Sequence, residues 1–304
     1  MATTISQAFS EFKSRLELNE SFQEKITTHH NTIREWIENY DPKIETKLIG
    51  SLQRNTRIQP RTNDTFDIDI LVILGEFHRI ATDRSGVSPS DAIDKLYKIM
   101  KEHGTYRKMD PSKDYPTVYI EYSDGTKVEL VPAYKDFIYE PKGQGYRIPK
   151  SYYEWISADY DYDAEYISKK NKETDGYLIP TIKMLKAAKR NVFPEMKSYH
   201  LEILAVDIIS LIVNYLKSEG YQLSYPTLIY SFFLIGKDEI KNSVKIPGSK
   251  SPNAGSYLNE IEKTQLAEKF KRICNYCTSF IKDDGKEAIE KWKKLFGEPF
   301  PAYG

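Results

Sequence analysis

The stretch LIGSLQRNTRIQPRTNDTFDIDILVIL, residues 48–74, contains the pattern that decides the fold. It begins with a Gly-Ser turn at 50–51 and ends in an apolar segment that holds two aspartates, Asp67 and Asp69, among isoleucine, leucine and valine. Apart from these acids the segment is apolar on both faces, which indicates a central strand of a sheet. Burying one unpaired charge is unfavourable and burying two of the same sign is more so, which means that these acids need a partner.

Alternate side chains of a strand project to the same side, and we therefore expect Asp67 and Asp69 to face one cleft. Two like charges that close raise one pKa unless a cation sits between them. Ligands that are all oxygen select a hard ion such as Mg²⁺ or Mn²⁺. Glu129 lies in a later strand, in the segment KVELVPAY, and would complete a two-metal site. For a single acid in a strand, a surface position or an ion pair is the alternative interpretation.

The Gly-Ser turn supplies features that suit a phosphate. Gly50 permits close backbone approach, and Ser51 offers a hydroxyl where the following N–H groups can point at an anion. Asn55 and Thr56 prolong this polar turn. A Gly-Ser dipeptide is common on its own, but one followed sixteen residues later by Asp-Ile-Asp in an apolar strand is much more specific.

Composition limits the class of protein. The chain has 304 residues, of which 40% are hydrophobic, and 44 basic side chains balance 44 acidic ones. Zero net charge does not indicate a general electrostatic grip on long nucleic acid. The N-terminus lacks the pattern of a signal peptide, and no apolar run approaches the ~20 residues of a membrane span. The best such run, ILAVDIISLIV, is interrupted by Asp207, and we therefore expect a cytoplasmic protein without a membrane partner.

The periodicity of the first half predicts an α+β arrangement. Residues 5–39 read as one long helix or two joined ones, and TKLIGS reads as a short strand. The segment 88–104 reads as a helix with Ser90 as its N-cap. The segment 117–134 reads as a hairpin with Asp124-Gly125 in its turn and Pro132 at its end.

The second half is predicted to be helical, and the two halves suggest separate lobes. We expect a catalytic lobe over residues 1–150 that includes the long N-terminal helix, a helical lobe over 151–296 and a flexible tail over 297–304. The helices of the second lobe are expected near 152–169, 175–190, 198–218, 225–241, 257–282 and 285–296.

The two cysteines, Cys274 and Cys277, form a CxxC pattern. Zinc needs about four ligands, and the chain has no other cysteine to complete the set. The flanking residues have helical periodicity, so we interpret the pair as part of a packed helix face.

The segments GSLQRNT, DIDILV and VELVPAY together resemble the polymerase-β-like nucleotidyltransferase superfamily. Within it the chain is most similar to the bacterial CD-NTases, relatives of cyclic GMP–AMP synthase and oligoadenylate synthetase. The resemblance implies a mixed sheet with flanking helices plus a C-terminal helical lobe. The family pattern falls on Gly50, Ser51, Asp67, Asp69 and Glu129, and it departs in one place, because the third acid of the family is usually aspartate.

Two helical segments extend the resemblance and imply how nucleotides bind. LIPTIKMLKAAKR is similar to a family helix whose lysines face the triphosphate, and the matching positions are Lys183 and Lys186. KSYHLEILA is similar to the next motif, in which Ser198 matches a serine that contacts phosphates and Tyr199 matches an aromatic that stacks on the base. Together with Ser51 and Thr56, these residues are the expected nucleotide site.

The resemblance also implies the reaction and its partners. Two Mg²⁺ ions, or Mn²⁺, would bind to Asp67, Asp69 and Glu129. The expected substrates are ATP or GTP, with pyrimidine NTPs as the alternative. The product would be a cyclic di- or trinucleotide second messenger of CBASS-type antiphage defence, read by a separate effector protein. The terminal Gly304 suggests attachment to a target by ubiquitin-like conjugation enzymes, and an ordinary frayed terminus is the alternative.

Three other functions remain open at this point. A template-independent polymerase or CCA-adding enzyme shares the ELVPAY segment but usually has a sizeable extra tRNA-binding portion. An antibiotic or protein nucleotidyltransferase would need a separate acceptor. A degenerate nucleotide-binding scaffold is supported by Glu129 alone, and the intact Asp67, Asp69 and Ser51 argue against it.

Overall fold

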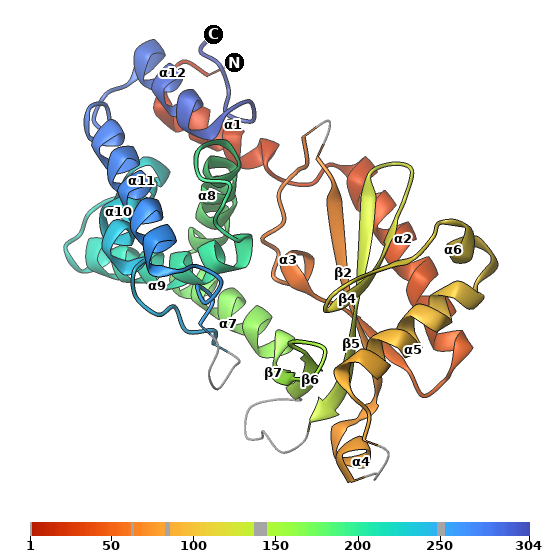
Figure 1. Ribbon diagram of the computed structural model, residues 1–304. Helices are drawn as coiled ribbons and strands as arrows, with labels where there is room; N and C mark the ends of the chain where they lie inside the picture. The colour runs from red at the N-terminus through yellow and green to blue at the C-terminus, as the bar shows by residue number, and fades with distance from the viewer. Residues whose placement is uncertain (1, 62–63, 83–85, 137–144, 248–252) are drawn as a thin grey trace.

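The two largest buried apolar cores belong to a sheet lobe and a helical lobe, which lie side by side (Figure 1). The structure is a computed structural model, and it describes residues 2–61, 64–82, 86–136, 145–247 and 253–304. The predicted fold class, a polymerase-β-like core with a C-terminal helical lobe, is confirmed.

A seven-stranded mixed sheet forms the first lobe, with β2 and β5 at its centre. These two strands run parallel to each other, and the other strand pairs among the described residues are antiparallel. The order is β1-β2-β5-β4-β3, while β6 pairs with β5 and with β7. The strands are β1 (Glu45–Leu48), β2 (Phe66–Glu76), β3 (Ser112–Asp114), β4 (Thr117–Glu121), β5 (Thr126–Asp136), β6 (Gly145–Pro149) and β7 (Trp155–Ala158).

Helices α2 (Glu20–Tyr40) and α5 (Pro89–Glu102) pack on one face of this sheet and share its core. The opposite face carries a third, smaller apolar cluster formed by Ile49, Leu71, Ile73, Val131, Ala133 and Tyr146. Beside this cluster, side chains of the same face point toward the helical lobe. Three shorter helices complete the lobe: α3 (Gly50–Gln53), α4 (Phe77–Thr82) and α6 (Gly104–Lys108).

The helical lobe is built around α9, whose most apolar part is largely buried. This helix is long and apolar enough to cross a membrane by length and composition, but 61% of its most apolar window is buried inside the protein, as in a core helix. The predicted bounds 198–218 and 285–296 are confirmed. The helices are α7 (Tyr160–Glu173), α8 (Leu178–Val192), α9 (Ser198–Ser218), α10 (Tyr225–Glu239), α11 (Glu260–Thr278) and α12 (Gly285–Phe296).

The two ends of the chain meet in the helical lobe (Figure 1). The structure places α1 (Ile5–Arg15) in this lobe rather than with the catalytic lobe, because Phe9 and its neighbours pack against rings from α12. Segment 297–304 follows the same cluster: Phe300 is fully buried, and its ring centroid lies 5.2 Å from that of Phe9. Only Glu298 and the last three residues of this segment are exposed.

Three local predictions differ from the structure. The N-cap of α5 is Ser88 rather than Ser90, because Pro89 takes the first helical position and Asp91 completes a capping box. β5 continues through Pro132, which lies between the residues paired with β4 and those paired with β6. The helix expected near 152–169 begins later, after β7.

The cysteine prediction agrees with the structure. Cys274 and Cys277 are free, buried residues of α11. Burial raises the pKa of both thiols, that of Cys277 to about 12, which makes either one a weak nucleophile.

Candidate active site

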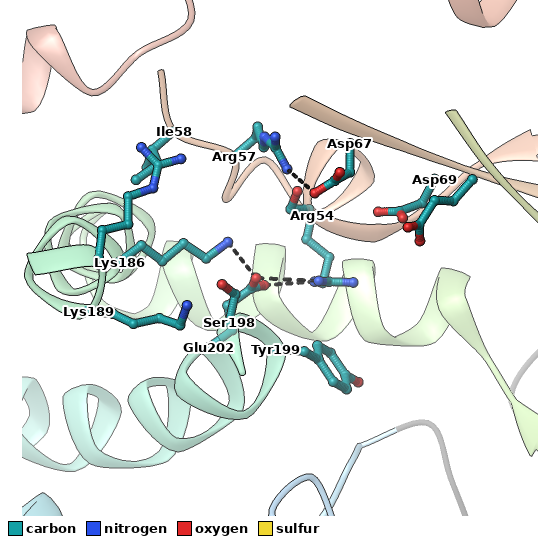
Figure 2. A pocket seen from close by; sticks show the side chains of 13 residues that line it. Arg54, Arg57, Ile58, Asp67, Asp69, Lys186, Lys189, Ser198, Tyr199 and Glu202 are labelled. Carbon is teal, nitrogen blue, oxygen red and sulfur yellow. Dashed lines mark hydrogen bonds and ion pairs between the residues drawn. The ribbon is translucent and has the colours of Figure 1, made fainter. Parts of the chain in front are cut away.

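Asp67 and Asp69 point from β2 toward the helical lobe (Figure 2). The residues that alternate with them, Ile68 and Ile70, point to the other side and are fully buried in the sheet core. Burial, together with the negative charges of Glu129 and Asp67, raises the pKa of Asp69 to about 6. The alternation of the strand therefore accounts for the two acids: one face of β2 packs the core and the other forms the site.

Glu129 comes to the same place from the neighbouring parallel strand. The register of β2 and β5 pairs Asp69 with Glu129 and Asp67 with Lys127, and all four side chains therefore belong to one face of the sheet. Lys127 Nζ lies 2.6 Å from a carboxylate oxygen of Glu129. The third acid is thus adjacent to the pair but is held by a lysine of its own strand.

Gly50 fits against Asp69 with no room for a side chain. Its φ is +72°, and a Cβ at this position would lie 2.0 Å from Asp69 Oδ2. The N–H of Ile49 donates to the main-chain oxygen of Asp69 at 2.9 Å, which fixes the turn against the strand. Ser51, the next residue of α3, lines the cavity in front of the acids. The Gly-Ser turn therefore positions both a hydroxyl and a carboxylate.

The carboxylate oxygens of the site are ligands of the type that a hard divalent cation prefers. Asp67 and Asp69 offer carboxylate oxygens on one face, and the crowding that raises the pKa of Asp69 is what a bound cation would relieve. Within the part of the chain that the structure describes, no three His, Cys, Asp or Glu side chains stand close enough together to hold an ion as arranged. Glu129 meets Lys127 through one carboxylate oxygen in this arrangement.

A cavity of about 270 Å³ opens between the acids and the helical lobe. Five cationic side chains and four carboxylates line it. The cations come from the segment after α3 and from α8, and the carboxylates include the three acids of the sheet. The cationic residues are Arg54, Arg57, Lys186, Lys189 and Arg190. Such a surface can bind a polyanion beside a carboxylate cluster.

The two lysines predicted from the sequence lie differently. Lys186 lines the cavity at its floor, where its ammonium pairs with Glu202 at 2.6 Å. Lys183 does not line the cavity; its ammonium pairs with Glu17 at 2.6 Å. Thr56 is fully buried, donates to Glu202 at 2.8 Å and also does not line the cavity. In this geometry the side chains of Lys183 and Thr56 are engaged with Glu17 and Glu202 respectively.

Ser198 and Tyr199 line the cavity from the start of α9. The Tyr199 hydroxyl donates to Asp163 at 2.6 Å, and the guanidinium of Arg54 lies 4.7 Å from its ring centroid. Tyr199 and Arg54 also line a second cavity of about 250 Å³. That cavity is bounded largely by aliphatic and aromatic side chains, among them Ile148, Ile156, Ala158, Tyr160 and Ile246.

Several residues of the site escaped prediction from the sequence. Arg54 and Arg57 stand in the polar segment between the two motifs, where arginine normally indicates a solvated loop. Lys189 stands on a helix, where a lysine normally indicates a solvated face. Glu202 could have been found, because it follows Ser198 by four residues and therefore shares its helix face.

The fold is the polymerase-β-like core with a C-terminal helical lobe. A Second Messenger Oligonucleotide or Dinucleotide Synthetase domain matches residues 3–171, more than half of the chain. The chain therefore belongs to this family of bacterial CD-NTases, as its sequence predicted.

Two relatives are similar over most of their length. A probable cyclic nucleotide synthase of Bacillus cereus is 26% identical over 300 residues, which covers 88% of this chain and 86% of the relative. A cyclic AMP-AMP-AMP synthase of Acinetobacter is 23% identical over 311 residues, which covers 98% and 86%.

Solved structures of other CD-NTases share the fold. The structure of Escherichia coli CdnC with ATP matches with a TM-score of 0.72 at 13% identity, over 98% of this chain and 99% of that one. The Vibrio cholerae cyclic AMP-GMP synthase DncV, in complex with a linear intermediate, matches with a TM-score of 0.64 at 15% identity, over 85% and 69%.

Proposed function

We propose that this protein condenses nucleoside triphosphates into a cyclic di- or trinucleotide and releases pyrophosphate. One observation carries the proposal: Asp67, Asp69 and Glu129 line the same cavity as a set of lysines and arginines. Carboxylates suited to divalent cations therefore face side chains suited to phosphate oxygens. Membership of the synthetase family and the printed activities of its relatives support the same reaction.

Asp67 and Asp69 would hold two Mg²⁺ or Mn²⁺ ions, with Glu129 as the third ligand. Such ions lower the pKa of an attacking ribose hydroxyl and neutralise the leaving pyrophosphate. Glu129 would leave Lys127, approach the reacting centre and accept the proton of the attacking ribose hydroxyl. Gly50 keeps the Asp69 carboxylate in place, because its missing side chain leaves room for that carboxylate.

The cationic side chains that line the first cavity would bind the triphosphate. Arg57, Lys189 and Arg190 line the cavity and can form charge-assisted hydrogen bonds with the phosphates. Ser51 and Ser198 add hydroxyl donors from opposite lobes. Stacking of a base on an aromatic ring such as that of Tyr199 contributes about 1–3 kcal/mol and tolerates different bases.

The second, mainly apolar cavity would receive the base of the other nucleotide. It shares Tyr199 and Arg54 with the first cavity, which allows two nucleotides to lie in adjoining spaces. A linear dinucleotide would then turn in the site and close into a ring or be extended once more. ATP or GTP are the proposed substrates, and CdnC and CdnG have been solved with ATP and GTP respectively.

A mixture of four labelled NTPs tests the reaction. The protein is incubated with them and Mg²⁺ or Mn²⁺, the products are treated with phosphatase, and what survives is analysed by mass spectrometry. We expect a phosphatase-resistant cyclic product, and none from the Asp67→Ala, Asp69→Ala double variant. Label that appears only in added RNA would replace the proposal with the polymerase alternative. Nucleotide binding without pyrophosphate release would replace it with the scaffold alternative.

The proposal extends to an antiphage second messenger, read by a separate effector protein, and to conjugation through Gly304. Ala2 and Tyr303 form a parallel bridge, and the Gly304 N–H donates to the Ala2 carbonyl at 3.3 Å. Conjugation would therefore require the last residues to leave the N-terminus. An adduct that appears with the partner enzymes and is lost on deletion of Gly304 supports the idea, and absence of an adduct ends it.

A further inference from the structure

Glu202 is a fully buried carboxylate at the floor of the cavity (Figure 2). One of its oxygens accepts hydrogen bonds from Arg54 Nε and Thr56 Oγ1, both at 2.8 Å. The other lies 2.6 Å from Lys186 Nζ and 3.4 Å from the second guanidinium donor of Arg54. Every oxygen of this carboxylate therefore has a partner, and two of the partners are cations.

The partners of Glu202 come from both lobes. Arg54 and Thr56 belong to the segment that follows the Gly-Ser turn, Lys186 to α8 and Glu202 itself to α9. Lys186 also donates to the Thr56 carbonyl at 2.9 Å. The cluster thus joins the two lobes directly behind the predicted phosphate site.

The same cluster reaches the aromatic side of the site. Arg54 is held by Glu202 on one side and lies over the Tyr199 ring on the other. The Tyr199 hydroxyl in turn donates to Asp163. A change at Glu202 would therefore shift two groups of the proposed nucleotide site. These are the Lys186 ammonium, on the phosphate side, and the Tyr199 ring, on the base side.

We propose that Glu202 is a positioning residue of the nucleotide site, acting through Lys186 and Arg54 rather than by touching the nucleotide. This inference rests on the proposed function, because it assumes that a triphosphate occupies the cavity. Breaking a buried ion pair leaves a charge without compensation, so the pair holds its members in one arrangement. Glu202 thereby keeps Lys186 protonated at a buried position, where burial disfavours the charged form.

The protonation of Lys186 supplies a signature that a purely structural role would lack. Burial lowers the pKa of Lys186 to about 8, while Glu202 opposes this and the nearby Arg54 and Arg57 reinforce it. The pKa of Glu202 itself is lowered to about 2, because Lys186 and Arg54 outweigh its burial, so the carboxylate is ionised at neutral pH. Replacing Glu202 with glutamine removes the one opposing charge and lowers the pKa of Lys186 further. The neutral lysine must then take up a proton when the triphosphate binds.

The test is the affinity for the magnesium complex of a non-hydrolysable ATP analogue, measured by calorimetry from pH 7.0 to 8.5. The phosphate groups, with a second pKa near 6, stay ionised over this range. For Glu202→Gln we expect affinity to fall about tenfold from pH 7 to pH 8, against about twofold for the wild type, by proton linkage.

Glu17→Gln is the matched control, because it breaks the equivalent 2.6 Å pair with Lys183 on the same helix but outside the cavity. Its affinity and pH dependence should equal those of the wild type. An equal slope for Glu202→Gln and Glu17→Gln would overturn the inference. If the wild type binds no nucleotide at all, the proposed function fails first and this inference with it.

A second variant keeps the inference testable if Glu202→Gln does not fold, which a thermal melt would reveal. Lys186→Met removes the titrating ammonium while Arg54 still neutralises Glu202. We expect weaker binding that is independent of pH between 7 and 8.5, whereas wild-type affinity declines above pH 8. A decline that persists in Lys186→Met would assign the titration to another group and refute the role of this pair.

Discussion

Replacing Gly50 with alanine tests whether the turn positions the Asp69 carboxylate. The new Cβ would lie 2.0 Å from Asp69 Oδ2, where contacts below 3.0 Å are essentially never seen, so the carboxylate must move by about 1 Å. The strand cannot retreat easily, because the main-chain oxygen of Asp69 accepts from the Ile49 N–H at 2.9 Å. A misplacement of about 1 Å in a catalytic site can lower the rate about 10²-fold, and we expect that loss in kcat.

Backbone strain must be separated from the clash. Alanine at the positive φ of Gly50 also costs about 1–2 kcal/mol of stability. Gly220 has nearly the same φ, +70°, but a Cβ there meets nothing within 4 Å, and Gly220→Ala therefore shows the cost of strain alone. Initial rates of pyrophosphate release and urea unfolding are measured for both variants. If Gly50→Ala retains a kcat within about threefold of that of Gly220→Ala, the turn does not position the carboxylate.

Three further predictions follow from particular contacts. Lys189→Met should raise the KM for NTPs about tenfold in steady-state kinetics, since a lost hydrogen bond between charged groups is worth about 1.5–3 kcal/mol. Lys183→Met should leave the KM unchanged, and equal effects of the two variants would contradict the placement of Lys189 inside the cavity and Lys183 outside it. Phe9→Ala should lower the free energy of unfolding by about 3–5 kcal/mol in urea titrations, because the Phe9 ring is buried against the rings of Trp292 and Phe300. A loss below about 1 kcal/mol would argue against that packing. Burial lowers the pKa of His200 from 6.5 to about 4, so the unfolded chain binds the extra proton first and the contribution of His200 to stability falls as the pH drops below 6.5. The raised pKa of Asp69 acts in the opposite direction, so the effect is measured as the free energy of unfolding of the wild type minus that of His200→Gln. We expect this difference to fall by about 2 kcal/mol between pH 7 and pH 5, and an unchanged difference would assign the effect to other groups.

The parts of the fold that sequence could predict are those in which local pattern and tertiary role agree. The apolar segment 66–74 is central in the sheet, and α9 and α12 begin and end where their periodicity places them. β6 and β7 could not be predicted in the same way. They are short and pair with each other, and β6 alone pairs with the far end of β5. The segment 152–169 has helical periodicity over much of its length.

The residues of the site differ in the same way in how well sequence predicts them. Asp67 and Asp69 are recognisable because a carboxylate in an apolar strand is improbable without a function. Arg57 and Lys189 are not, because the same residues on a loop or a helix normally face solvent. Their role depends on the distance between two lobes, which no local pattern encodes. The buried charge of Glu202 is compensated by Lys186 from the preceding helix and by Arg54 from a segment far away in the sequence.

The glutamate at the third acidic position has a structural counterpart on its own strand. Lys127 precedes Glu129 by two residues, faces the same side and lies opposite Asp67 in the register of the parallel pair. The extra methylene of glutamate adds about 1.5 Å of reach, and the carboxylate uses it to approach Lys127 Nζ at 2.6 Å. This contact neutralises one of three crowded acids when no cation is bound, while the pKa of Asp69 still rises to about 6. The glutamate at the third acidic position and the lysine two residues before it thus form a pair, and under the proposed function Glu129 would exchange this partner for a bound cation.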